Sequence, residues 1–175
     1  FPFEPSEVSS YIIEAGCEYF RFYKNNAQIL GTASLIANGD FAANLNNWTS
    51  TPTGTGLSVW QALYGGEAVL GAGGTGAGTI TFTQDVTVVA NAPNTVTFKI
   101  HEILTPVGAD RTYRVMVGST TGGSDILSQN LSATGTTSLT LTSTTTTLSV
   151  TFYVASTGFT LAQMKVDDVG VQGGS

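Results

Sequence analysis

From residue 32 onward, short runs of alternating apolar and polar residues are separated by turn clusters, and no stretch shows helical periodicity. "GTITFTQDVTV" and "NTVTFKIHEIL" are such runs, and "SLIANGDF" is a further candidate strand, whereas "TPTGTG", "GAGGTGAG" and "NAPN" are turn clusters. A period of two places successive side chains on opposite faces of a strand. The pattern therefore predicts an all-β fold, an antiparallel β-sandwich or jelly roll over residues 32–175.

The same alternation predicts which side chains fill the core of this sandwich. On each of the most regular runs, one face carries large apolar side chains and the other carries Thr, Ser and charged side chains. The residues that we expect in the core are Ile80, Phe82, Val96, Phe98, Ile100, Tyr113, Val115, Val117, Leu148, Val150 and Phe152.

Composition excludes several classes of function. Only 10% of the 175 residues are charged, the net charge is −6 and the isoelectric point is near 4.4. Nucleic-acid binding needs a basic stripe, and membrane attachment needs a polybasic patch or an apolar run of about 18 residues. We therefore expect no nucleic-acid partner and no membrane insertion. The single Cys17 excludes an internal disulfide, and the lack of an initiator Met and of a signal peptide suggests a processed chain or a piece of a larger protein.

The first 31 residues differ from the rest. Seven of the 17 aromatic residues (9 Phe, 6 Tyr and 2 Trp) lie among the first 23. "SYIIEAG" and "EYFRFYK" predict a β-hairpin, and a second turn leads to "AQIL". Both faces of this ribbon are aromatic, and a two-stranded ribbon alone is marginal in water, so we expect it to pack on other protein. We expect residues 1–31 to form an assembly segment whose surface includes Tyr11, Tyr19, Phe20, Arg21, Phe22 and Tyr23.

Four motifs of the sandwich resemble those of carbohydrate-binding jelly rolls. They are "NGDFAANLNNWTS" (38–50), "ITFTQDVTVVANAPNTVTFKI" (80–100), "YRVMVGSTTGG" (113–123) and "MKVDDVGV" (164–171), and they occur in that family's order. The resemblance covers about residues 34–172. It implies that the first and last strands lie close together, with Leu35 near Val171, and that Trp48 fills the core.

The resemblance also implies a structural calcium ion between the first and last strands. Such modules hold it with backbone carbonyls and carboxylates, and calcium prefers these hard oxygen ligands. The matching residues here are Asn38, Asp40, Asp167 and Asp168. The family commonly has an acidic residue directly after the Phe, where this chain has Ala42, so one expected carboxylate is missing. No other cofactor is implied.

Sugar binding needs an aromatic ring for the apolar face of a pyranose and polar groups for its hydroxyls. The polar faces of the sandwich strands offer both, and we expect them to form one site. A solvated or partner-packed face, with a structural role for the histidine, is the alternative. Glu102 follows His101 directly, but the two would not form an acid-base pair, because adjacent residues of a strand point to opposite faces. The candidate glycan-binding residues are Tyr153, Lys99, His101, Arg114, Trp60 and Tyr64.

The segment "YIIEAGCEYFRFYKNNAQI" (11–29) resembles a motif near the start of bacteriophage tail proteins of the nozzle or tail-tube class. This implies a structural virion component whose partners are other tail proteins and copies of itself. Its jelly roll either packs on neighbouring tail proteins or contacts host cell-surface polysaccharide. The alternative is an extracellular glycan-binding module of a secreted bacterial enzyme or adhesin. We expect no catalysis, because no nucleophile elbow, metal-binding His pair or Ser-His-Asp spacing is present, and converging carboxylates have no support.

Overall fold

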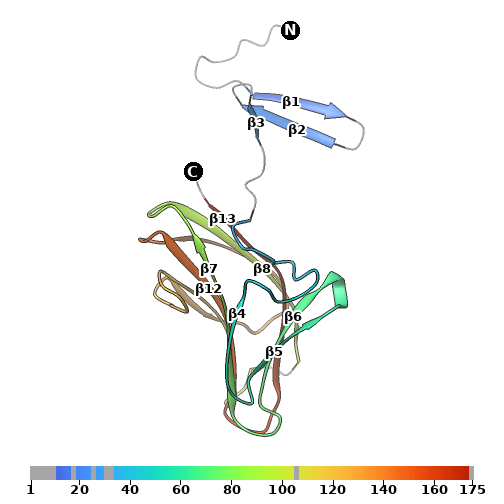
Figure 1. Cartoon of the computed structure of the whole chain (residues 1–175), viewed down its shortest axis with the longest axis vertical. Coiled ribbons are helices and arrows are strands. Elements are labelled where there is room, and N and C mark those ends of the chain that lie inside the picture. Colours follow the sequence, from blue (N-terminus) through green and yellow to red (C-terminus); the bar gives the residue numbers. More distant parts are fainter. Residues whose placement is uncertain (1–10, 17–18, 25–26, 30–33, 105–106, 174–175) are drawn as a thin grey trace. The chain divides into compact units, whose positions relative to one another are not determined.

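Figure 1 shows the computed structural model of the chain, which divides into two compact units, residues 1–33 and 34–175. Every regular element is a β-strand except for one short 3-10 turn, within the residues that the structure describes: 11–16, 19–24, 27–29, 34–104 and 107–173. The prediction of an all-β chain is confirmed. Over these ranges, no helix has the length and apolar character needed to cross a bilayer.

The first unit contains a three-stranded antiparallel meander. Its strands are β1 (Tyr11–Gly16), β2 (Tyr19–Lys24) and β3 (Ala27–Ile29), in the order β1-β2-β3. Tyr11 pairs with Lys24 at one end of the hairpin. The predicted hairpin is therefore confirmed. The side chains of these strands lie outside the described part of the structure, so the assembly surface on them stays a prediction.

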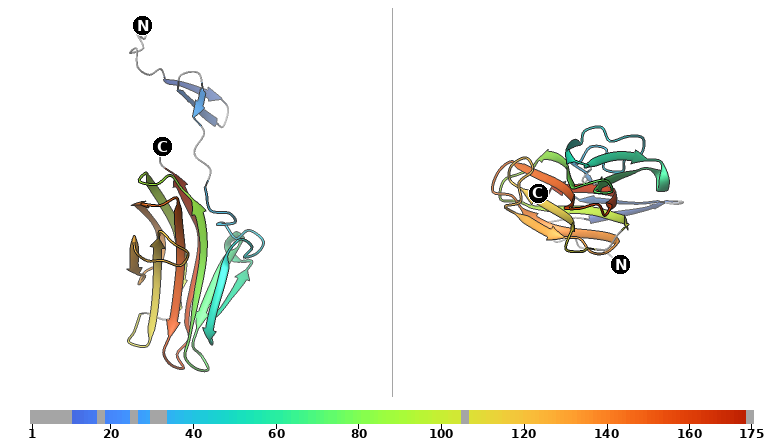
Figure 2. Two further views of the ribbon diagram at one scale, coloured as in Figure 1. Left: turned by 60° about the vertical axis from the view of Figure 1, so that its left-hand side comes forward. Right: turned by 90° about the horizontal axis from the view of Figure 1, so that it is seen from below.

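The second unit is a sandwich of two five-stranded antiparallel sheets (Figures 1 and 2). One sheet, which we call the Tyr153 sheet, has the order β10-β9-β12-β7-β4. The other, the His101 sheet, has the order β11-β8-β13-β6-β5. The strands are β4 (Thr49–Gly54), β5 (Leu57–Gln61), β6 (Glu67–Ala72), β7 (Gly78–Thr87), β8 (Pro93–Ile103), β9 (Arg111–Gly118), β10 (Leu127–Asn130), β11 (Gly135–Thr142), β12 (Thr147–Ser156) and β13 (Ala162–Gly173).

The core lies between the two sheets, as the alternation predicts. All eleven predicted core residues are at most 2% exposed. Trp48 is 8% exposed and stacks on Phe82, with ring centroids 4.8 Å apart and an interplanar angle of 5°. Its expected structural role is confirmed. A stacked indole of this kind adds to the stabilisation that its buried area already provides.

The start and end of the sandwich are joined by hydrogen bonds. The N–H of Leu35 donates to the carbonyl of Val171 at 2.7 Å, which confirms their predicted proximity, and the N–H of Val169 donates to Gly39 at 2.8 Å. A Cβ on Gly39 would lie 1.8 Å from the Val169 carbonyl oxygen, so only glycine allows this approach.

Two local predictions are wrong. Residues 34–41 form bends and turns instead of a strand, because Asn38 and Phe41 adopt positive φ angles of 52° and 45° that interrupt extended backbone. Conversely, the first half of "TPTGTG" lies within strand β4, and only its end forms the turn to β5, where the N–H of Gly56 donates to the carbonyl of Thr53 at 2.9 Å. Pro52 is tolerated there because β4 is an edge strand of its sheet.

Candidate functional site

The structure places the predicted glycan-binding residues on two different sheets. Lys99 and His101 lie on β8 in the His101 sheet, whereas Arg114 on β9 and Tyr153 on β12 lie in the other sheet and pair with each other. The expectation that they form one site is therefore wrong. Period-two alternation separates inward from outward side chains, but it does not say to which sheet a strand belongs.

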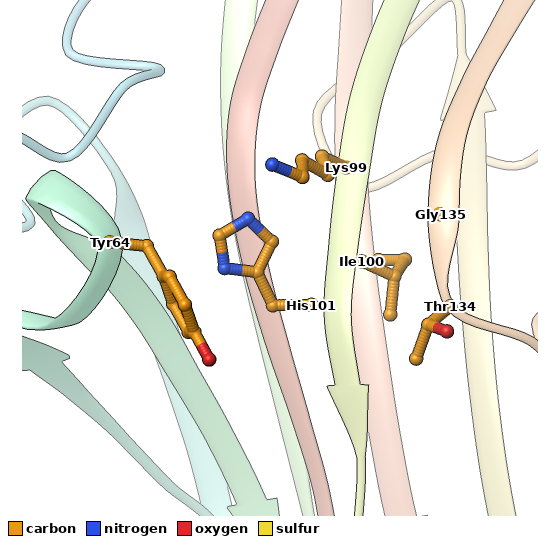
Figure 3. Close-up of a pocket in the computed structure, with 6 residues that line it drawn as sticks. All are labelled: Tyr64, Lys99, Ile100, His101, Thr134 and Gly135. Atoms are coloured by element: carbon orange, nitrogen blue, oxygen red, sulfur yellow. The ribbon is translucent and has the colours of Figure 1, made fainter.

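A hollow of about 310 Å³ lies on the outer face of the His101 sheet (Figure 3). Tyr64 stands at its side, 77% exposed, and its ring meets the His101 ring edge-to-face with centroids 4.7 Å apart. Lys99 extends to the same side of β8 as His101, whereas Ile100 between them points into the core. The hollow is lined by Tyr64, Lys99, Ile100, His101, Thr134 and Gly135.

Tyr64 is held beside this hollow in a strained backbone conformation. It is the middle residue of the 3-10 turn η1 (Leu63–Gly65) and has φ 53° and ψ 22°, a left-handed conformation that is uncommon for a bulky residue. Gly66 follows at φ 132°, and a Cβ there would lie 2.0 Å from the Phe41 carbonyl oxygen. Trp60 donates from Nε1 to that same oxygen at 2.6 Å. Trp60 thus anchors the turn and does not line the hollow.

A β-bulge brings His101 and Glu102 to the same face. In the β8–β13 pairing, Ile100 opposes Val166 and Glu102 opposes Lys165, which leaves His101 as the extra residue. A bulge of this kind re-aims side chains next to it. Accordingly, Glu102 makes an outward ion pair with Lys165 at 2.7 Å, and the prediction that it faces away from His101 is wrong.

Beneath the hollow, His101 lies between two carboxylates. Its Nδ1 is 3.3 Å from Oε2 of Glu67, and its Nε2 is 3.6 Å from Oδ2 of Asp167. The ammonium of Lys165 is 3.5 Å from the other Glu67 oxygen. The side chain of Glu67 is fully buried and that of His101 is 7% exposed. We call Glu67, His101, Glu102, Lys165 and Asp167 the Glu67 cluster.

Several polar atoms of this cluster lack a hydrogen bond. Neither oxygen of Glu67 and neither ring nitrogen of His101 has a hydrogen-bond partner within the described residues. Because a neutral imidazole has one N–H, it can donate to only one of its two flanking carboxylates, whereas the doubly protonated ring can donate to both. Buried polar atoms in native proteins are nearly always satisfied, so this group needs an explanation.

Burial and neighbours shift the pKa of two groups in the cluster in the same direction. Burial raises the pKa of the Asp167 carboxyl, and this outweighs the opposing effects of the hydrogen bond from Asp168 and of nearby His101 and Lys99. The hydrogen bond to Glu102 raises the pKa of the Lys165 ammonium despite its desolvation, and Glu67 adds to this increase. Lys165 therefore keeps its positive charge against the two glutamates.

Three members of the cluster, Glu67, Glu102 and Lys165, were not predicted from the sequence. Lys165 and Asp167 alternate in "MKVDD", so their shared outward face was readable from the spacing. Glu67 gives no such signal, because it is the first residue of its strand and its burial depends on the turn that follows β5.

The structure brings together three of the four predicted calcium ligands. Asn38, Asp40 and Asp168 line one hollow of about 380 Å³, but the Asp167 carboxylate faces His101 on the sheet instead. The Asn38 amide nitrogen donates to the Asn44 carbonyl at 2.9 Å. Calcium takes about six to eight oxygen ligands, several of them carboxylates. No set of three His, Cys, Asp or Glu side chains in the described ranges is placed to hold a metal ion, and only two carboxylates, those of Asp40 and Asp168, line this hollow, so the full predicted ligand set is not assembled.

No known protein-family profile and no curated protein matches the sequence, but solved structures share its fold. The enzymatically active domain of tailspike protein 4 from bacteriophage CBA120 matches 79% of this chain with a TM-score of 0.59 at 15% identity. The match spans only 21% of that tailspike chain.

Two further structures match over nearly their whole length. The K1 cleaved adhesin domain of Lys-gingipain from Porphyromonas gingivalis has a TM-score of 0.55 at 11% identity, with 78% of this chain and 96% of that chain covered. TmCBM61, solved with β-1,4-galactotriose, has a TM-score of 0.51 at 11% identity, with 79% and 97% covered. Residues 34–175 thus have the β-sandwich fold that carbohydrate-binding modules share with adhesin domains and a phage tailspike domain.

Proposed function

We propose that the sandwich binds a glycan in the hollow beside Tyr64. The observation that carries this proposal is an exposed aromatic ring, held in a strained backbone conformation at the side of a hollow that a lysine and a threonine also line. Strain of this kind persists where the surrounding structure fixes it, and it concentrates at functional positions.

The groups around the hollow suit a sugar. The Tyr64 ring offers a flat apolar surface, and the Lys99 ammonium and the Thr134 hydroxyl line the same hollow. A few polar groups placed around an aromatic wall are typical of small-ligand sites. Sugar hydroxyls both donate and accept hydrogen bonds, so they can accept from the Lys99 ammonium and exchange hydrogen bonds with the Thr134 hydroxyl. The galactotriose bound by TmCBM61 supports the same class of ligand, since the two proteins share a fold.

The finer proposal is that this module belongs to a structural component of a phage tail and meets host surface polysaccharide or neighbouring tail proteins. It is supported by the resemblance of residues 11–29 to tail proteins and by the fold shared with a phage tailspike domain. In this proposal the first unit assembles with other tail proteins or copies of itself, the module lies in the virion, and it has no catalytic role.

The second candidate is a glycan-binding module of a secreted bacterial enzyme or adhesin. The fold shared with the Lys-gingipain adhesin domain favours it. The two candidates differ in the role of residues 1–31: tail assembly needs this segment, whereas an extracellular module binds without it.

Glycan binding is tested on an array of neutral and acidic glycans, followed by calorimetric titration of each neutral hit. Tyr64→Ala should weaken binding of the neutral hits by about tenfold or more, because it removes the ring that covers one sugar face. Phe159→Ala is the matched control, since Phe159 is 78% exposed but lies outside the hollow. Equal losses in both variants, or no neutral hit, would refute this site.

Assembly is tested by measuring the mass in solution of the full chain and of residues 34–175. The tail proposal expects a larger species for the full chain and a monomer for residues 34–175. A monomer in both cases, with glycan binding retained, would favour the extracellular module.

A further inference from the structure

The outer face of the Tyr153 sheet carries a straight row of polar side chains across all five strands. Asn130 pairs with Arg114, Arg114 with Tyr153, Tyr153 with Thr81, and Thr81 with Thr51. We call these five residues the Tyr153 row. Adjacent strands are about 4.8 Å apart, so the row runs for roughly 19 Å perpendicular to the strands.

Hydrogen bonds show that these side chains share the outer face. Arg114 donates from Nε to Oδ1 of Asn130 at 3.1 Å, and Thr81 donates from its hydroxyl to the carbonyl of Thr51 at 3.3 Å. The inward neighbours of Tyr153 on β12, Phe152 and Val154, are fully buried. The row therefore lies on the side of the sheet that faces away from the core.

A hollow of about 360 Å³ adjoins the ring of Tyr153. The small side chain of Ala155 keeps the surface low on one side of the ring, and Thr53 and Thr79 line the hollow with hydroxyls that are 2.7 Å apart. Such an arrangement gives an aromatic side wall with hydroxyl groups next to it. It lies on the opposite sheet from the hollow beside Tyr64, so the two are separate.

The charge of this face is unusual for an acidic chain. Arg114 has no carboxylate within ion-pairing distance in the described ranges, and only its Nε is engaged, by Asn130. Asp85, further along β7, accepts a hydrogen bond from Thr121 at the end of the sheet. The rows that flank the Tyr153 row contain no acidic residue; their members are Ser128, Met116, Thr151, Thr83 and Thr49 on one side and Thr112, Ala155, Thr79 and Thr53 on the other.

We propose that the Tyr153 row binds an acidic polysaccharide, with the Arg114 guanidinium on a sugar carboxylate and the Tyr153 ring beside a sugar ring. The free terminal amino groups of Arg114 can hold a carboxylate with two parallel hydrogen bonds. The spacing between strands is comparable with the length that one sugar adds to an extended polysaccharide, so successive units meet successive strands. A linear anionic chain lying across the strands thus matches both the shape and the charge of the row.

The test is affinity electrophoresis of the full 175-residue chain through gels that contain polygalacturonate, alginate or hyaluronate. The chain has a net charge of −6, so non-specific attraction to these polyanions is disfavoured and retardation reports a specific site. We expect retardation by at least one of the three and its loss when the carboxylates are methyl-esterified. Arg114→Gln should raise the apparent dissociation constant about tenfold or more, and Arg114→Lys should fall between the two.

Arg111→Gln is the matched control, because Arg111 is on the same strand but lies 3.4 Å from Asp110. It should leave retardation unchanged, as should Tyr64→Ala on the opposite sheet. The proposal is overturned if none of the three polyanions retards the native chain, or if Arg111→Gln and Arg114→Gln weaken retardation equally. Binding of neutral glycans at Tyr64 and binding of anionic polysaccharides at Arg114 are measured in separate assays. A negative result for one site therefore does not refute the other.

Discussion

Replacing Lys165 with methionine should destabilise the sandwich far more than the same change at Lys99. Lys165 is the only ammonium within ion-pairing distance of the fully buried Glu67 in the described part of the chain, and it also pairs with Glu102 at 2.7 Å. Methionine keeps most of the length and apolar character of the lysine stem but removes its charge. Glu67 would then remain buried with only His101 beside it.

The expected magnitude follows from this burial. Removing one partner of a buried ion pair costs about 3–5 kcal/mol, because the remaining charge is left uncompensated. Lys165 is slightly exposed and His101 still faces Glu67, so we expect the lower end, about 3 kcal/mol. For a sandwich of this size each kcal/mol lowers the melting temperature by about 3 °C, which predicts a fall of about 9 °C.

The assay is urea unfolding followed by tryptophan fluorescence, since Trp48 lies in the core. Lys99→Met is the control, because Lys99 lies on the same face but has no ion pair within the described residues; it should change stability by less than about 0.5 kcal/mol. The double variant Glu67→Gln, Lys165→Met should recover most of the loss, with a coupling energy of about 2 kcal/mol. Equal effects of the two lysine changes would refute the assignment of Lys165 to the Glu67 cluster.

Two further predictions concern pH and metal. Because burial raises the pKa of Asp167 above its ordinary 3.8, the folded protein holds this proton more tightly than the unfolded chain, and ionisation lowers stability as the pH rises through that raised value. The stability of Asp167→Asn relative to the native chain, measured by urea unfolding, should therefore increase as the pH rises above 3.8. A difference that stays flat or declines would contradict this. Chelation with EDTA should leave the melting temperature unchanged, since the Asp167 carboxylate faces His101 and is missing from the hollow that Asn38, Asp40 and Asp168 line. A fall that added calcium reverses would contradict this.

The sequence predicted the architecture well because strand alternation is a direct consequence of backbone geometry. The predicted inward-facing residues of β7, β8, β9 and β12 are all buried, and the predicted proximity of Leu35 and Val171 is confirmed. The errors lie where local geometry departs from the regular pattern. Positive φ at Asn38 interrupts an apparent strand, and the edge position of β4 accommodates Pro52.

The candidate site was predictable only in part. His101 and Lys99 were found from their outward spacing, but the bulge that turns Glu102 to the same face depends on pairing with β13, which no local pattern reveals. Likewise, Tyr153 and Arg114 were correctly read as outward-facing, yet sheet membership comes from topology and placed them on the other side of the sandwich. No sequence pattern identified Glu67 as a member of the cluster; only the folded structure shows that its side chain is buried beside His101.

The hydrogen bond between Leu35 and Val171 has a mechanical consequence. Because the two ends of the sandwich meet side by side, tension applied between them first separates this pair and then the contact between Gly39 and Val169. These bonds open one at a time, as in a zipper, and the initial load does not pass through the aromatic core around Trp48. A module with this arrangement can yield a few residues of slack under load while its two sheets stay folded.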